Sequence, residues 1–261
     1  MKYFIDTKFY ENQNTIDLIS IGIVSEDIAH IPDIIEGKEY YAISKDFNLK
    51  KAWNAYRITI VKESQFKYIA KKVYWLRINV FKPIYRDLMN KETSKMPYHT
   101  SKLFNDYPMD YKSFKKLIKK YGKTNEQIAK EIESFIHAPC RLENGQSITN
   151  NTPLLSVLNV PVVSLEDFDT QFYGYNSAYS WVVFAQLFKG VINFPDGFPK
   201  YCNDLKQELE RLNETLGYNC DEQGHSYKLQ KHSNYPKKDN SYDALANAIW
   251  NKLLYEFLNK L

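Results

Sequence analysis

Three apolar segments near the start of the chain have the pattern of β-strands. They span residues 2–8, 17–25 and 38–44. The second is too rich in β-branched residues for a comfortable helix, and a turn-rich link at residues 11–14 precedes it, so we expect an antiparallel meander. Side chains two residues apart on a strand share a face, which predicts Asp6 and Lys8 on one side of the sheet and Thr7 on the other.

Farther along the chain, apolar residues recur at helical spacing. Residues 66–91 have this spacing, with Pro83 expected to kink or end the helix. A capping box, Thr124-Asn125-Glu126-Gln127, starts a short amphipathic helix. Additional helices are expected at residues 48–54, 179–188, 204–216 and 242–261, and short strands at 160–164 and 172–175. Strands followed by helices in this order agree with an α/β fold.

The amino-acid composition indicates the number of domains and the cellular compartment of the protein. The 261 residues are 44% hydrophobic and contain no long linker, so we expect one elaborated domain with a sizeable core. The cysteines form no CxxC pair, which fits a reducing compartment. We find no signal peptide and no apolar stretch near the ~20 residues of a membrane span. These features predict a cytoplasmic protein without a membrane partner.

The positive charge is concentrated in one segment. Residues 50–123 hold 19 Lys and Arg against 5 Asp and Glu, a surplus of 14 positive charges, whereas the whole chain has a net charge of only +4. The same segment contains 14 aromatic residues. Cations that follow phosphates and rings that stack on bases are typical of proteins that bind single-stranded nucleic acid. The alternative is that the rings form core and the lysines form a solvated face.

Two groups of basic residues are candidates for nucleic-acid binding. The first stripe is Lys62, Lys67, Lys71, Lys72 and Arg77. The second is Lys112, Lys115, Lys116, Lys119, Lys120 and Lys123. A protein partner remains an alternative for the same surface.

The framework of the chain resembles a known family. Tyr3-Phe4-Ile5-Asp6-Thr7-Lys8-Phe9 is followed by Leu18-Ile19-Ser20-Ile21-Gly22, and further similar blocks lie at residues 172–209 and 241–258. These segments are similar to the DEDD-type 3′-5′ exonucleases, above all to bacterial exoribonucleases related to RNase T. The resemblance implies an α/β, RNase H-like fold: residues 1–261 as a single exonuclease-type domain, a mixed central sheet flanked by helices, and a basic helical insertion at about residues 50–123.

The resemblance fails at the residues that carry the chemistry. Family members open with Asp-x-Glu, have a central Asp, and end with His-x-Ala-Leu-x-Asp-Ala. The corresponding residues of this chain are Asp6, Lys8, Ser180, Tyr242 and Asn247. Of these, only Asp6 keeps the family residue. Tyr242 replaces a His that a related subclass also replaces with Tyr, so a catalytic role is one alternative. We favour the other, an aromatic residue at the start of a helix that packs on the core.

The charges at these positions determine whether the site can bind divalent metal ions. Two-metal exonucleases surround two divalent ions with several carboxylates. Here one carboxylate faces one ammonium, and such a pair at ~4 Å is worth roughly 4 kcal/mol at an effective dielectric of about 20. We therefore expect no metal site and no cofactor, with the Lys8 ammonium within reach of Asp6, or of Ser180 and Asn247. If the site is active, Mg²⁺ or Mn²⁺ is the expected ion.

Three hypotheses follow from the sequence. The first is a catalytically degenerate 3′-5′ exonuclease homologue that binds single-stranded RNA or DNA, or a protein partner. The second is an active, metal-dependent 3′-5′ exoribonuclease with an unusual site. The third is a protein-binding inhibitor or scaffold.

Overall fold

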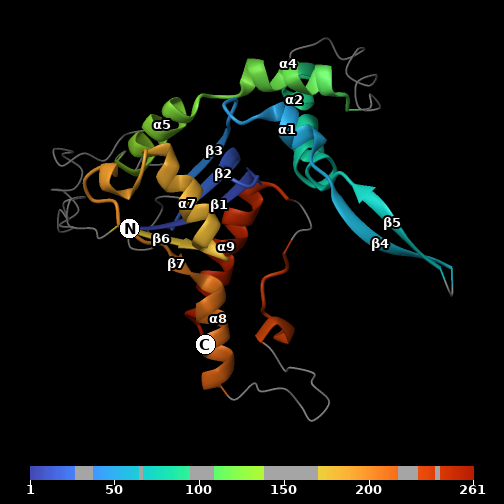
Figure 1. Ribbon diagram of the computed structural model, residues 1–261. Coiled ribbons are helices and arrows are strands. Elements are labelled where there is room, and N and C mark those ends of the chain that lie inside the picture. The colour runs from blue at the N-terminus through green and yellow to red at the C-terminus, as the bar shows by residue number, and fades with distance from the viewer. Residues whose placement is uncertain (27–37, 65–66, 95–108, 138–169, 217–228, 239–241) are drawn as a thin grey trace.

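A mixed five-stranded sheet forms the centre of the molecule (Figure 1). The computed structural model describes residues 1–26, 38–64, 67–94, 109–137, 170–216, 229–238 and 242–261. The strands, in the spatial order β3-β2-β1-β6-β7, are β3 (Glu39–Ile43), β2 (Ile16–Ser25), β1 (Lys2–Glu11), β6 (Gln171–Gly174) and β7 (Asn203–Asp204). β1, β2 and β3 pair antiparallel, and β6 and β7 run parallel to β1. The predicted meander and the short strand near residue 172 are confirmed; the strand predicted at 160–164 lies outside the described residues.

Helices cover both faces of the sheet. One face packs on α5 (Asn125–His137) and α7 (Ser177–Leu187), and its core includes Ile5, Ile132 and Phe184. The other face lies against α9 (Ala244–Leu258), which packs with α8 (Leu205–Thr215) through Leu209 and Leu254. The capping box forms as predicted, since the amide of Gln127 donates to the Thr124 hydroxyl and Gln127 Oε1 accepts from the Thr124 amide. The mixed α/β architecture with flanking helices is therefore confirmed.

A glycine sets how closely α9 approaches the sheet. Gly22 on β2 is the register partner of Asp6 on β1. A Cβ atom at Gly22 would lie 2.5 Å from the backbone of Ala244 and Leu245, closer than van der Waals contact allows. The first turn of α9 therefore lies almost on the sheet, directly beside Asp6.

The segment between β3 and α5 packs on the edge of the sheet, in a second hydrophobic core that also includes Ile19 of β2 and Ile43 of β3. Its elements are α1 (Leu49–Asn54), β4 (Arg57–Ser64), β5 (Lys67–Val73), a π-helical turn (Arg77–Phe81), α2 (Lys82–Thr93) and α4 (Tyr111–Tyr121). Stacked and tilted rings of Trp53, Phe81 and Phe114 lie at the centre of this core.

The prediction of one helix over residues 66–91 was wrong in its first part. Strand β5 occupies residues 67–73 and pairs antiparallel with β4, so the insertion carries a β-hairpin as well as helices. The hairpin projects from the body of the molecule (Figure 1). Pro83 does not end the helix: helical backbone continues from the π-helical turn through Pro83 into the rest of α2.

Candidate functional site

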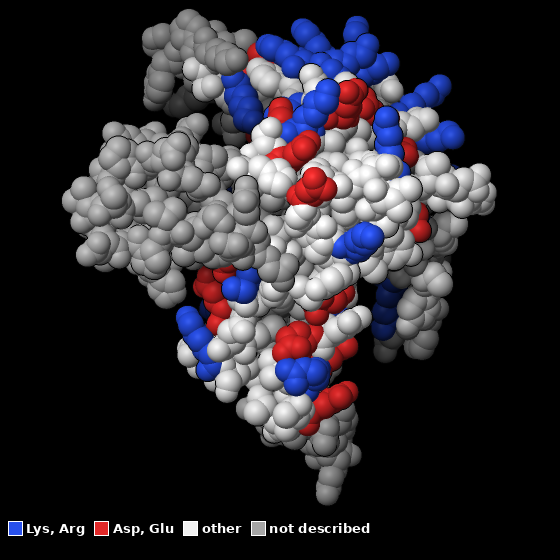
Figure 2. Space-filling model, turned by 90° about the vertical axis from the view of Figure 1, so that its left-hand side faces the viewer, with Lys and Arg blue, Asp and Glu red and all other residues white. Residues whose placement is uncertain are grey.

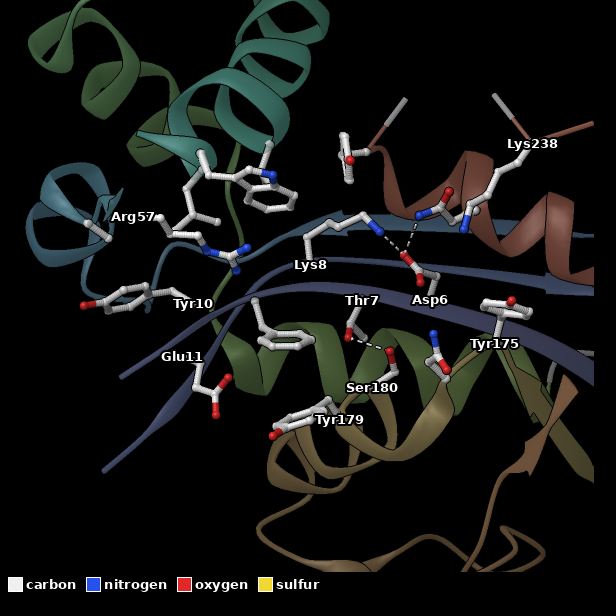
Figure 3. Close-up of a pocket in the computed structure, with 18 of the residues that line it drawn as sticks. Asp6, Thr7, Lys8, Tyr10, Glu11, Arg57, Tyr175, Tyr179, Ser180 and Lys238 are labelled. Carbon is white, nitrogen blue, oxygen red and sulfur yellow. Dashed lines mark hydrogen bonds and ion pairs between the residues drawn. The ribbon is translucent and has the colours of Figure 1, made fainter. Parts of the chain in front are cut away.

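A cavity of about 570 Å³ opens beside β1, between the N-terminal ends of α7 and α9 and the base of the insertion (Figure 3). All five residues that the sequence matched to the family's catalytic positions line it: Asp6, Lys8, Ser180, Tyr242 and Asn247. The fold thus brings together side chains separated by up to 241 residues in the chain.

Three of these residues form one polar cluster. The Lys8 ammonium makes an ion pair with Oδ2 of Asp6, and Nδ2 of Asn247 donates to the same oxygen at 3.2 Å. The side chains of Lys8 and Asp6 are only 11% and 15% exposed. Strand alternation places both on one face of the sheet, as predicted, and α9 covers that face. The Asp243 carboxylate caps α9 by accepting from the Ala246 amide. The predicted contact between Lys8 and Asp6 is confirmed.

A second cation lies near this cluster. Lys238, in the segment before α9, lines the same cavity, and its ammonium lies 4.5 Å from the ring centroid of Trp250 (Figure 3). Burial raises the pKa of the Asp6 carboxyl, while the charges of Lys8 and Lys238 and the Asn247 amide act in the opposite direction. Burial lowers the pKa of Lys238, and the Asp6 carboxylate opposes this shift. The sequence comparison missed Lys238, because it belongs to none of the similar blocks.

Ser180 lies on the opposite side of β1 from Asp6. The Thr7 hydroxyl donates to Oγ of Ser180 at 3.0 Å, and Thr7 points to the face covered by α7 (Figure 3). Beside this contact Phe9 stacks on Tyr179, with ring centroids 5.7 Å apart. The predicted proximity of Ser180 to Asp6 therefore holds only in that both line one cavity, since the Ser180 hydroxyl is bonded to Thr7 on the other face of β1.

Tyr242 precedes α9 and links it to the insertion. Its ring packs edge-on against Trp75, with centroids 4.9 Å apart, and the side chain is partly exposed at the cavity. The guanidinium of Arg57 lies 5.2 Å from the Trp75 ring on the same cavity wall. Tyr242 thus packs as an aromatic residue, as expected, but against the insertion and not in the core under the sheet. Arg57 was not singled out from the sequence, although it begins a β-branched run that is typical of a strand.

The first basic stripe does not form a single surface. Lys62 and Lys72 lie on one face of the hairpin and Lys71 lies on the other, because the pairing of Ile58 with Lys72 and of Thr59 with Lys71 alternates faces. Lys67 belongs to β5, but its side chain is outside the described part. Arg77 turns inward: its guanidinium donates to the Trp53 carbonyl and lies 4.0 Å from the Tyr74 ring centroid. A nucleic-acid contact by Arg77 is therefore not supported by its position.

The second basic stripe forms along α4. Lys112, Lys115, Lys116 and Lys119 are exposed and recur at helical spacing, opposite the buried Phe114, Leu117 and Ile118. Figure 2 shows Lys and Arg side chains gathered at the upper end of the molecule, where Figure 1 places α4. Lys120 makes an ion pair with Glu92, and Lys123 makes one with Glu131. The stripe is thus a real surface feature, although two of its lysines are already paired.

Two further observations concern the described residues as a whole. Among them, no three His, Cys, Asp or Glu side chains gather as a metal-binding group. In the same part of the chain, each helix is too short or too polar to cross a membrane.

The comparisons with known proteins give a partial match. Two curated 3′-5′ exoribonucleases share part of this sequence. Both come from Mycobacterium tuberculosis, one from strain CDC 1551 / Oshkosh and one from strain ATCC 25618 / H37Rv, and each is 48% identical over 52 residues. The match spans 20% of this chain and 26% of either relative. No family model matches the chain. This similarity over 52 residues indicates a relationship to exoribonucleases only at a coarse level.

Proposed function

We propose that this chain is a degenerate homologue of the 3′-5′ exoribonucleases that binds single-stranded nucleic acid without the two-metal chemistry. In this proposal residues 1–261 form one RNase H-like domain, and residues 50–123 are its insertion. The partial similarity to two exoribonucleases and the mixed sheet flanked by helices are compatible with this fold.

One observation carries the proposal: the ammonium of Lys8 is bound to the single carboxylate of the cluster. In a two-metal exonuclease, the corresponding place holds divalent ions between several carboxylates. Here Asn247 offers only an amide to Asp6, and the Ser180 hydroxyl is engaged by Thr7. Mg²⁺ and Mn²⁺ prefer several oxygen ligands, so these residues do not fit a pair of such ions.

The walls of the cavity suit a nucleic acid. Cations at its rim include Arg57 and Lys238, and rings on its walls include Tyr175, Tyr179 and Trp75. Cations can pair with phosphates, and exposed rings can stack on bases with little sequence preference. Beyond the cavity, the lysines along α4 extend the positive surface.

A labelled single-stranded RNA and a labelled single-stranded DNA test the proposal, with binding and shortening scored together. Each is incubated with the parent protein with Mg²⁺, with Mn²⁺ and without divalent ions. We expect salt-sensitive binding under all three conditions and no shortening. Trimming by the parent that is lost in Asp6→Ala would instead establish the active exoribonuclease. Absence of binding to either strand would favour a protein partner.

A restored site provides the converse test. The four changes are Lys8→Glu, Ser180→Asp, Tyr242→His and Asn247→Asp. We expect metal-dependent shortening of single strands by this variant and none by the parent. The matched control carries the same changes with Asp6→Ala, which removes the remaining carboxylate of the parent and should remain inactive.

A further inference from the structure

The β4–β5 hairpin has one face with an unusual exposure of apolar side chains. Ile58, Ile60 and Tyr68 are 66%, 72% and 64% exposed. Strand register places them together, since Ile60 pairs with Ala70 and Lys62 pairs with Tyr68. On the opposite face, by contrast, the paired Val61 and Ile69 are partly buried. We call the exposed side the ribbon face; its members are Tyr56, Ile58, Ile60, Lys62, Tyr68 and Lys72.

The ribbon face begins at the cavity that contains Asp6. Tyr56 lines this cavity, and the Lys72 ammonium lies 4.5 Å from the centroid of the Tyr56 ring. Tyr74 packs edge-on against the same ring at 6.1 Å. From Tyr56 the face continues along the hairpin to Tyr68, which is paired with Lys62. Tyr56 directly precedes β4, and Lys62 lies six positions farther along the chain, so at ~3.3 Å per residue the two ends of the face lie about 20 Å apart.

The charge of the hairpin selects the kind of occupant. Residues 56–74 contain five Lys and Arg and one Glu. A second copy docked face to face would bring Lys62 and Lys72 of both copies together, whereas a polyanion would neutralise them. The cavity at the base of the face has a cationic and aromatic wall of the same kind, formed by Arg57 and Trp75. A single strand that enters the cavity is therefore the occupant that both parts of the surface suit.

We infer that the ribbon face is the track along which single-stranded nucleic acid reaches the cavity. Bases stack on Tyr68 and Tyr56, phosphates pair with Lys62 and Lys72, and the exposed isoleucines contact the apolar faces of sugars and bases. This inference rests on the proposed function, and it assigns the entry path to one face of one hairpin.

Neighbouring lysines on opposite faces provide the decisive comparison. Lys71 and Lys72 are adjacent, exposed and equal in charge, but only Lys72 belongs to the ribbon face. Binding of a labelled single strand is measured against salt concentration for Lys72→Gln and Lys71→Gln. One lost phosphate contact should change the slope of log K against log salt by about 0.7. We expect this change for Lys72→Gln and a parental slope for Lys71→Gln.

An aromatic comparison tests stacking separately from charge. Tyr68→Leu keeps an apolar side chain and removes the ring, and Tyr201→Leu makes the same change at a similarly exposed tyrosine, 62% exposed, away from the hairpin. Loss of one stacked base should weaken binding by roughly tenfold for Tyr68→Leu. Tyr201→Leu should bind like the parent. In an oligonucleotide length series, the effect of Tyr68→Leu should appear only for strands long enough to reach from the cavity to the tip.

The outcomes separate the inference from the function on which it rests. If the parent binds and the Tyr68 and Lys72 variants bind equally well, the track is refuted while nucleic-acid binding stands. If Lys71→Gln and Lys72→Gln change the slope alike, the face assignment is refuted. Loss of a self-association by Tyr68→Leu, with unchanged nucleic-acid binding, would make the face an interface between copies. Absence of any binding by the parent overturns both proposals.

Discussion

Replacing Lys8 by Met tests the internal cation most directly. Met fills a similar volume and removes the ammonium, both its charge and its hydrogen bond to Asp6. It leaves the Asp6 carboxylate, whose side chain is 15% exposed, with the Asn247 amide at 3.2 Å and Lys238 farther away. Removing one partner of a buried pair typically costs ~3–5 kcal/mol. Because these two neighbours remain, we expect the lower part of that range, about 3 kcal/mol, in the free energy of unfolding at neutral pH.

The loss of unfolding free energy in Lys8→Met should be larger at neutral pH than at acidic pH. Burial raises the pKa of Asp6 above its ordinary 3.8, and loss of the Lys8 ammonium raises it further. A carboxyl with a raised pKa binds more protons in the native than in the unfolded state, so stability falls as pH rises between the two pKa values. The deficit of Lys8→Met is therefore complete above the folded-state pKa of Asp6 in the variant, and it shrinks on acidification until Asp6 is protonated in the parent as well.

Urea unfolding followed by circular dichroism, at neutral and at mildly acidic pH, measures this deficit. The control adds Asp6→Asn to Lys8→Met, which removes both charges and should recover most of the loss. A second control is Lys130→Gln, which breaks the exposed pair with Glu126 and should leave stability nearly unchanged. A deficit for Lys8→Met within the ~0–1 kcal/mol of exposed pairs, and equal at both pH values, would refute the reasoning.

Three further predictions concern the packing of α9 on the sheet and the lysines of α4. Gly22→Ala should lower the free energy of unfolding by roughly 1–3 kcal/mol, because its Cβ would meet the Ala244 backbone; unchanged thermal stability would show that α9 moves freely. Asn251→Leu should lower the free energy of unfolding by about 1–3 kcal/mol, because Nδ2 of Asn251 donates at 2.9 Å to the buried Ile5 carbonyl. The control in the same denaturation assay is Asn259→Leu, which removes a hydrogen bond at the exposed end of α9. Replacing four α4 lysines by Ala should flatten the salt dependence of nucleic-acid binding by up to about 2.8 units of slope, whereas a parental slope would exclude α4 from the contact surface. The four are Lys112, Lys115, Lys116 and Lys119.

The elements around the sheet could be predicted because local pattern and tertiary environment agree there. The segment containing Asp17 to Val24 is both β-branched and buried, so propensity and packing favour the same strand. The contact of Lys8 with Asp6 followed from the two-residue period of β1. The position of Asn247 followed from the resemblance, and its hydrogen bond to Asp6 agrees with it.

The insertion shows where a single sequence misleads. Ile69 and Val73 are four residues apart, which suits one face of a helix but also one face of a strand, where every second side chain points the same way. The partner strand β4 resolves the ambiguity, and only tertiary structure supplies it. Likewise, the inward turn of Arg77 onto the Trp53 carbonyl depends on a packing contact between α1 and the π-helical turn that no periodicity encodes.

The ion pair of Lys8 with Asp6 also changes how the site responds to its surroundings. A metal ion that exchanges with solvent stabilises its site in proportion to the logarithm of its concentration. An ammonium tethered to the same strand cannot be chelated, exchanged or diluted, so its occupancy is fixed when the chain folds. In the metal-free site that we propose, the electrostatic state of the cavity would therefore not depend on the concentration of divalent ions.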